Sequence, residues 1–268
     1  MLSVTGFGQD GPESHRQAYA PIIHAEAGYI ARHAEMDGNP PSDPIFSIAD
    51  SYAALHGTIA LLSALHMRER TGVGQHVDLC MLRAMVATDD YSHHLLDDDL
   101  PPERLGGQVF DAVGGQILIS SQWKGLWYQF KRVLGVSASD GVNLEEKIAN
   151  RERAIREKIS SYTDRAELER DLDRARLPWG VVRSMHEVLD SPTLKSLDLY
   201  AEVDDRGNGT RKVIQAPYEF SDADSGVRGP AAHRGEHNTE VLQHWLSLPT
   251  DEIESFEKAR VLLCDGGN

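Results

Sequence analysis

The feature that most constrains the fold is a glycine-rich segment near the start of the chain, where three glycines lie within six residues. The run Thr5-Gly6-Phe7-Gly8-Gln9-Asp10-Gly11-Pro12 directly follows Leu2-Ser3-Val4, which predicts the end of a β-strand. Glycine permits positive φ angles and close approach of the backbone to a neighbour. The sequence therefore predicts a strand that leads into a tight loop, either a ligand-binding loop or a plain strand-to-helix turn.

The glycine spacing also matches the dinucleotide-binding fingerprint Gly-x-Gly-x-x-Gly. That fingerprint needs a helix whose N-terminus faces the pyrophosphate directly after the loop. The residues that follow, Pro12-Glu13-Ser14-His15-Arg16-Gln17, show no apolar periodicity for such a helix. We therefore do not expect a nicotinamide or flavin site here.

Composition excludes several functional classes. The 268 residues are 40% hydrophobic and 26% charged, which is typical of a soluble globular protein. A formal net charge of −15 argues against binding to nucleic acid or an anionic membrane. No apolar run reaches the roughly 18 residues of a membrane span, and the start lacks a basic leader region. We expect a cytoplasmic protein in which Cys80 and Cys264 are reduced.

Helical periodicity dominates the first part of the chain. Apolar residues recur every three or four positions and predict one long helix that Gly72 ends: Ile48, Tyr52, Leu55, Ile59, Leu62 and Leu65. Residues 75–82 fit either a buried strand or the start of another helix. The acidic turn at residues 97–99, with Pro101 and Pro102, predicts a domain boundary.

The pattern changes after residue 105. Val109-Phe110 and residues 116–119 predict a hairpin, and residues 123–134 predict an aromatic-rich helix. Two charged helices follow, and a capping box at Ser184 opens a third, which Ser191-Pro192 ends. Beyond Tyr200 we expect loops, a strand at residues 212–214 and two terminal helices starting near Thr239 and Pro249. The middle of the chain therefore resembles a small α+β unit.

Two histidine-containing stretches could suggest a metal. His233-Arg234-Gly235-Glu236-His237 fits the H-x-x-E-H pattern of zinc peptidases, but Gly235 lies inside the turn that would have to be helical. The adjacent His93 and His94 would point about 100° apart on a helix. We expect no metal site, and we interpret both stretches as loop or solvated helix-end residues.

Four motifs, in order along the chain, carry a resemblance to a known family. The first is the Thr5–Pro12 segment, which leads into Ala18-Tyr19-Ala20-Pro21. The second consists of residues 48–50 and, after a helix, the run Arg70-Thr71-Gly72-Val73-Gly74-Gln75-His76-Val77-Asp78. The third and fourth lie at residues 177–182 and 231–242. This series resembles the class III CoA-transferases, the group of formyl-CoA and carnitine CoA-transferases. The resemblance covers nearly the whole chain.

The resemblance implies an α/β fold in which a large domain is interrupted by a small α+β domain. The large-domain part would comprise residues 1–100 and return in residues 199–268, with the small domain at residues 105–198. Members of the family also carry a βαβ half ahead of the glycine segment and form interlocked dimers. We therefore expect an incomplete large domain, and an obligate homo-dimer or a hetero-oligomer with a longer chain.

The implied chemistry needs an aspartate that this chain lacks. In the family an aspartate attacks the donor thioester to give a mixed anhydride, then an aspartyl-CoA that the acceptor carboxylate reopens. That position falls on Ala20, and a methyl group cannot act as a nucleophile. Glu26, six residues on, is a candidate replacement, as are Glu13 and Asp10, although Glu26 also fits a surface carboxylate. His24 stands where the family commonly has Gln and could make similar hydrogen bonds.

Two glycine-containing segments are candidate substrate-binding sites. The first is Gly6, Phe7 and Gly8, which would approach the substrate thioester. The second is Gly106, Gly107 and Gln108, which is similar to a glycine loop that closes over the active site in the formyl-CoA branch. A lead-in to the predicted hairpin is the alternative interpretation of the second segment.

The resemblance leaves three functions open. The chain could be a CoA-transferase, or a subunit of a split one, that uses a CoA thioester as substrate without a permanently bound cofactor. Because of Ala20 it could instead be a non-catalytic subunit that binds CoA or acyl-CoA, or that regulates. It could also be an inactive fragment with an intact fold.

Overall fold

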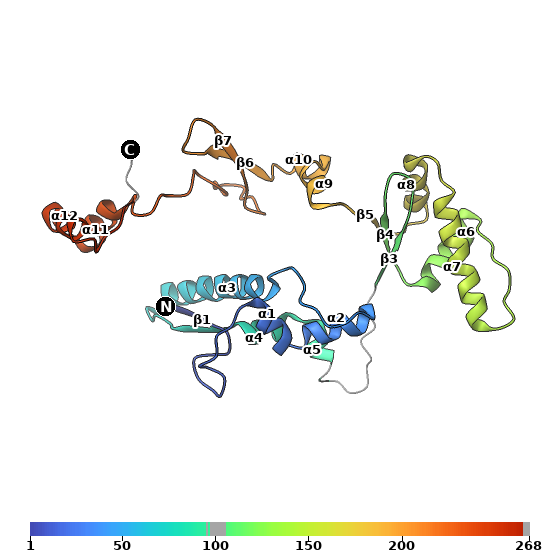
Figure 1. Cartoon of the computed structure of the whole chain (residues 1–268), viewed down its shortest axis with the longest axis horizontal. Coiled ribbons are helices and arrows are strands. Elements are labelled where there is room, and N and C mark those ends of the chain that lie inside the picture. The colour runs from blue at the N-terminus through green and yellow to red at the C-terminus, as the bar shows by residue number, and fades with distance from the viewer. Residues whose placement is uncertain (95, 97–105, 265–268) are drawn as a thin grey trace. The chain divides into compact units, whose positions relative to one another are not determined.

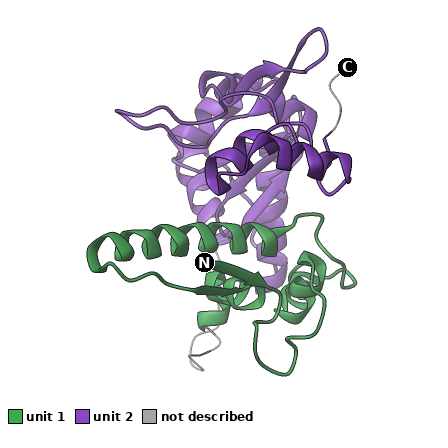
Figure 2. Cartoon of the chain, turned by 90° about the vertical axis from the view of Figure 1, so that its left-hand side faces the viewer, with its two compact units in different colours: residues 1–104 green, residues 105–268 purple. Residues whose placement is uncertain are grey.

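The computed structural model describes residues 1–94, 96 and 106–264. The chain divides into two units, residues 1–104 and residues 105–268, coloured separately in Figure 2. The predicted boundary at residues 97–99, Pro101 and Pro102 lies outside the described residues. Whether residues 199–268 return to the first unit stays a prediction.

The first unit packs helices around a short parallel sheet (Figure 1). Its elements are β1 (Leu2–Thr5), α1 (Ala20–Glu26), α2 (Tyr29–Asp37), α3 (Ile48–Thr71), β2 (Val77–Cys80), α4 (Met81–Thr88) and α5 (Asp90–His94). β1 pairs with β2 in parallel, from Leu2 opposite Val77 to Thr5 opposite Cys80. Within the described residues, no third strand extends this sheet. Residues 75–82 thus contain both a strand and the start of a helix.

Small residues set the buried face of α3. Ala49, Ala53 and Gly57 are its buried positions. A Cβ atom at Gly57 would lie 3.4 Å from the Leu2 side chain and 3.6 Å from that of Leu79, so the helix approaches the sheet closely. Gly72 then ends α3 with a φ of 73°, as predicted, because glycine adopts this left-handed conformation without strain.

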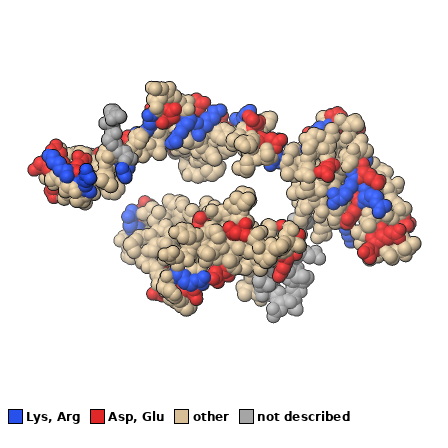
Figure 3. Space-filling model, viewed as in Figure 1, with Lys and Arg blue, Asp and Glu red and all other residues tan. Residues whose placement is uncertain are grey.

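The larger apolar side chains of α3 face away from this packing. Most of the predicted apolar stripe is exposed, and so are two further residues of the helix: Leu55, Ile59, Leu61, Leu62, Leu65 and Met67. Leu62, for example, is 60% exposed. In Figure 3 the face of the first unit along α3 carries few charged residues. This is an apolar surface of the kind that normally meets another polypeptide or a membrane.

By length and composition, α3 is the one described helix able to cross a membrane. Its most apolar 18-residue window has a mean hydropathy of 1.2, and 17% of that window is buried. The apolar residues of α3 form no uninterrupted run long enough for a membrane span, because His56, Ser63 and His66 interrupt them. A helix whose apolar face is covered by another polypeptide would show the same mean hydropathy and, in the isolated chain, the same buried share.

The second unit begins with a well-packed core of sheet and helices. Its strands β3 (Gly107–Phe110), β4 (Ile117–Ser120) and β5 (Trp179–Val181) form an antiparallel sheet in that order. Three helices pack with the sheet, namely α6 (Trp123–Leu134), α7 (Leu144–Ser160) and α8 (Arg165–Arg174). The core includes Phe110, Ile117, Leu126, Phe130, Ile155 and Leu172. The predicted hairpin and aromatic helix are confirmed.

The rest of the second unit consists of short elements. These are α9 (Met185–Leu189), α10 (Pro192–Ser196), β6 (Tyr200–Asp204), β7 (Thr210–Ile214), α11 (Asn238–Leu246) and α12 (Thr250–Lys258). The Ser184 capping box is confirmed, since Ser184 accepts from the Glu187 amide and Glu187 accepts from the Ser184 amide. Pro192 opens α10 after α9 ends, because proline fits the first turn of a helix.

Candidate functional site

The backbone of the glycine segment is fixed by the end of β2. The Gly6 carbonyl accepts hydrogen bonds from the Leu82 amide at 3.1 Å and from the Cys80 thiol at 3.3 Å. The Thr5 hydroxyl oxygen accepts from the Gly8 amide at 3.0 Å. The loop therefore leaves the sheet in one defined direction, at the carboxyl end of β1.

Each glycine of the segment has a separate structural requirement. A Cβ atom on Gly6 would lie 2.2 Å from the Ala18 Cβ, so no side chain fits there. Gly8 and Gly11 have φ angles of 97° and 110°, which other residues rarely adopt. No helix begins at Pro12, and the next helix starts at Ala20. The sequence argument against a dinucleotide site therefore agrees with the local fold.

Arg16 joins the glycine segment to α1. Its guanidinium pairs with Glu13 at 2.7 Å and with Glu26 at 2.8 Å, and it lies 4.7 Å from the centroid of the Phe7 ring. The hydrogen bonds that Arg16 donates to Glu13 and then to Glu26 raise the pKa of Arg16 above its ordinary value. Sequence reasoning missed Arg16, because its role depends on carboxylates from two separate segments.

Ala20 and Glu26 lie on different faces of α1. Ala20 is 2% exposed and packs in a cluster with Ile23, Ala49 and Met85. Six residues of helix correspond to a rotation of about 240°, and the Glu26 side chain is 41% exposed in its ion pair with Arg16. The Glu26 carboxylate therefore neutralises Arg16 and is turned away from the face that carries Ala20.

His24 shares the buried face of Ala20, one helical turn further along. Its Nδ1 lies 2.9 Å from the Asp43 carboxylate, and its Nε2 accepts a hydrogen bond from the Ala49 amide at 3.2 Å. Because Nε2 accepts from the amide, the matching tautomer has its N–H at Nδ1, where it donates a hydrogen bond to the Asp43 carboxylate. His24 thus satisfies an amide in the first turn of α3, and this is a structural use of both ring nitrogens. Nothing in the sequence spacing pointed to Asp43.

The second predicted binding segment lies in the other unit. Gly107 opens β3 opposite Ser120, and a Cβ atom there would come within 2.7 Å of the Leu118 side chain. A side chain at position 107 would therefore require the partly exposed Leu118 side chain to move, which gives this glycine a packing role in the hairpin. A binding role for Gly106, Gly107 and Gln108 stays a prediction.

The histidine-containing stretch at residues 233–237 is held by ion pairs and hydrogen bonds. Glu236 pairs with Arg206 at 2.8 Å and accepts from the His233 amide at 2.7 Å, and these two interactions lower the pKa of Glu236. Gly235 has a φ of 77°, so the stretch is a turn. In the part of the chain that the structure describes, no group of three metal-ligating side chains comes together.

Comparison with known proteins identifies the family to which this fold and glycine segment belong. The model of the family described as CoA-transferase family III matches residues 1–238. The chain therefore belongs to CoA-transferase family III, and the resemblance found in the motifs is confirmed.

Three similar proteins illustrate the match. The succinyl-CoA:mesaconate CoA-transferase of Haloarcula marismortui is 28% identical over 94% of this chain and 68% of its own length. The succinyl-CoA–L-malate CoA-transferase beta subunit of Chloroflexus aurantiacus is 24% identical over 98% of this chain and 69% of its own length. The solved structure of Rv3272 from Mycobacterium tuberculosis superposes with a TM-score of 0.68, at 26% identity over 89% of this chain and 67% of that one. The chain thus spans about two thirds of the length of these relatives. The predicted α/β fold of the family is confirmed.

Proposed function

We propose that this chain is one subunit of a CoA-transferase that moves CoA between an acyl-CoA and a carboxylic acid, with another polypeptide completing the active site. Membership of the family and the names of its relatives support the reaction class. The observation that carries the proposal is position 20. A buried methyl group stands there, beside an intact glycine segment.

The reaction needs a carboxylate that this position does not supply. A carboxylate must attack the thioester carbonyl and release the CoA thiolate. The thiolate then attacks the enzyme's acyl carbon in the resulting mixed anhydride, so that the donor acid leaves as a carboxylate and CoA stays on the enzyme as a thioester. A methyl group has no lone pair for the first step. Glu26 already neutralises Arg16 on another face of α1, so the proposal assigns the nucleophile to the partner.

The first unit also offers surfaces for such a partner. Its sheet has unpaired edges in the described residues, and isolated parallel strand pairs are normally covered on both faces. α3 exposes a row of large apolar residues. A relative that is itself a beta subunit shows that family members occur as parts of larger enzymes. The partner can be a longer chain or a second copy of this one.

Isotope exchange tests the reaction directly. We would incubate the assembly purified from its own cells with succinyl-CoA, which is named for several relatives, and labelled carboxylic acids, and measure label in CoA thioesters. Gly8→Ala forces a side chain into a φ of 97° in the glycine segment and should lower exchange at least tenfold. Gly38→Ala is the matched control, because Gly38 ends α2 with a φ of 68° at a site outside that segment. Equal losses in the two variants would contradict a substrate role for the segment.

Ala20 also favours a second function, a non-catalytic subunit that binds CoA or acyl-CoA. In that case the wild-type assembly would retain CoA. Gly8→Ala would weaken this retention and would leave the rate of CoA exchange unchanged. Exchange that depends on Gly8 favours the transferase subunit. CoA retention without exchange favours the binding subunit.

A further inference from the structure

A cleft between α6 and α7 in the second unit lies outside every segment assigned above. Its volume is about 280 Å³, which is near the lower end of the range for small-molecule sites. Two indoles and three aliphatic side chains form most of its lining, namely Trp123, Trp127, Leu144, Ile148 and Ile155. The cleft therefore suits a small apolar body, such as one or two fused rings.

Neighbouring side chains hold both indoles in place. The Trp123 ring packs edge-on against Phe110 with centroids 5.9 Å apart, and the Arg156 guanidinium lies 5.3 Å from its centroid. The Arg151 guanidinium lies 5.1 Å from the centroid of Trp127. Because these contacts already fix the rings, a ligand would not have to pay the entropy of ordering them.

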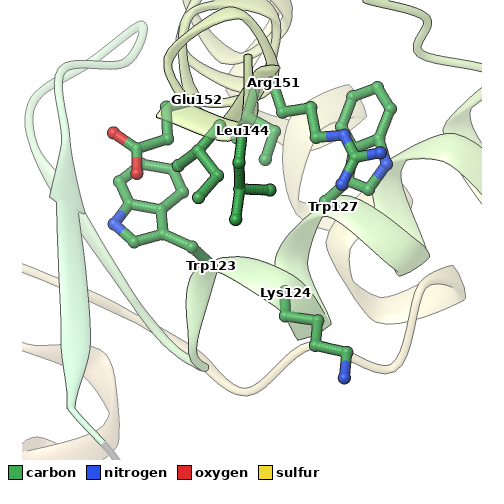
Figure 4. Close-up of a pocket in the computed structure, with 8 residues that line it drawn as sticks. Trp123, Lys124, Trp127, Leu144, Arg151 and Glu152 are labelled. Atoms are coloured by element: carbon green, nitrogen blue, oxygen red, sulfur yellow. The ribbon is translucent and has the colours of Figure 1, made fainter. Parts of the chain in front are cut away.

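The charges around the cleft are arranged unevenly. Figure 4 shows Arg151 beside Trp127 and Glu152 beside Trp123, at opposite ends of the cleft, while Lys124 adds a second cation to the lining. The carboxylate of Asp140 bonds to Lys147 at 2.9 Å and also interacts electrostatically with Arg151. Among the described residues, no carboxylate lies within ion-pair distance of Arg151. One end of the cleft thus presents a guanidinium that already stacks on an aromatic ring and can still pair with an anion.

We propose that this cleft binds a small aromatic carboxylate, with its ring against the two indoles and its carboxylate on Arg151. A planar apolar body matches the indole-lined wall, since aromatic rings favour offset or edge-on packing with indole. An anionic head matches a guanidinium, which binds carboxylates through two parallel hydrogen bonds. Glu152 at the other end fixes the orientation by repelling an anion there. The site would make the second unit a binding module for a free acid, apart from the glycine segment.

Calorimetric titration of the full chain with 2-naphthoate tests the proposal. The wild-type chain should bind 2-naphthoate at least tenfold more tightly than 2-naphthylmethylamine, which has the same rings and the opposite charge. Arg151→Gln should weaken 2-naphthoate binding at least tenfold. Arg153→Gln, which removes an exposed guanidinium from the same helix, should change binding less than twofold.

A second variant tests the place of binding without altering charge. Leu144 is 71% exposed at the start of α7, and Leu144→Trp should fill the cleft and reduce binding at least tenfold while circular dichroism shows an unchanged fold. The proposal is overturned if the wild-type chain gives no heat at millimolar 2-naphthoate, if the amine binds equally well, or if the arginine variants behave alike. The assay contains no CoA, so its failure leaves the transferase proposal untouched.

Discussion

The first unit and the core at the start of the second differ in how far they bury their own apolar residues. The core formed by the β3–β5 sheet and α6–α8 encloses twelve buried residues around Phe130 and Leu126. In the first unit the cluster around Ala20 has four, and α3 leaves its large residues exposed. The region with the family's glycine segment thus encloses the smaller apolar cluster of the two, and α3 adds a row of exposed apolar residues to it. The difference supports the proposal that another polypeptide completes this region.

The largest expected effect comes from emptying the well-packed core. Phe130 is fully buried, and Phe130→Ala should lower the free energy of unfolding by about 3–5 kcal/mol, as large-to-small core substitutions do. Urea denaturation followed by circular dichroism measures the loss. Leu62→Ala in α3 is the matched control and should change the free energy by less than about 0.5 kcal/mol. A comparable loss in both variants would show that α3 is buried in solution.

A carboxylate at position 20 should be the next most costly change. Ala20→Asp adds volume to a buried position and should destabilise the first unit by about 1–3 kcal/mol, with a further penalty for burying the carboxyl group. Ala20→Asn separates the effect of size from that of charge, because only the Asp variant should regain stability as the pH is lowered. If the partner leaves the site otherwise complete, Ala20→Asp in the assembly should also raise CoA exchange. A well-folded, assembled variant with unchanged exchange would count against a transferase pocket at this position.

The exposed face of α3 should affect assembly more than folding. Leu62→Asp places a charge on the apolar surface and should weaken association with the partner at least tenfold, about 1.4 kcal/mol. Thermal unfolding of the isolated chain should barely change, because the side chain is 60% exposed. Analytical ultracentrifugation of the assembly measures the effect. An assembly that tolerates Leu62→Asp would place the partner on another surface.

The smallest expected effect is a pH dependence in the second unit. The hydrogen bonds from Arg206 and from the His233 amide lower the pKa of Glu236. A carboxylate whose pKa is lower in the folded state than in the unfolded state stabilises the fold at pH values above its unfolded-state pKa. That contribution is lost as the pH falls through the folded-state pKa. Glu236→Gln should therefore reduce the loss of stability on acidification below about pH 4.5. The exposed Glu219, changed to Gln, is the control, and identical acid profiles for both variants would contradict this account.

Local chemistry explains what the sequence could predict. The aromatic helix α6, the Ser184 capping box and the end of α3 at Gly72 each depend on residues within a few positions of one another. The family assignment was accessible for a similar reason, since its motifs are short and contiguous. The prediction that Ala20 occupies the position of the family's aspartate rests on the same kind of short motif.

Contacts between distant segments could not be predicted in the same way. The periodicity of α3 marked its large apolar residues, but small residues at Ala49, Ala53 and Gly57 form the face that packs on the sheet. The bond between His24 and Asp43 joins segments nineteen residues apart. The pairing of Glu26 with Arg16 likewise needs the loop geometry, which sequence spacing does not contain.

The native mass of the assembly isolated from its own cells, with bound small molecules retained, tests the central claim most directly. The account predicts a particle larger than the 29.7 kDa of one chain, which contains a polypeptide that supplies a carboxylate near Ala20 and retains CoA or an acyl-CoA. A particle of 29.7 kDa without bound CoA would contradict it, because no partner would then supply the carboxylate that Ala20 lacks and the family's site would be incomplete.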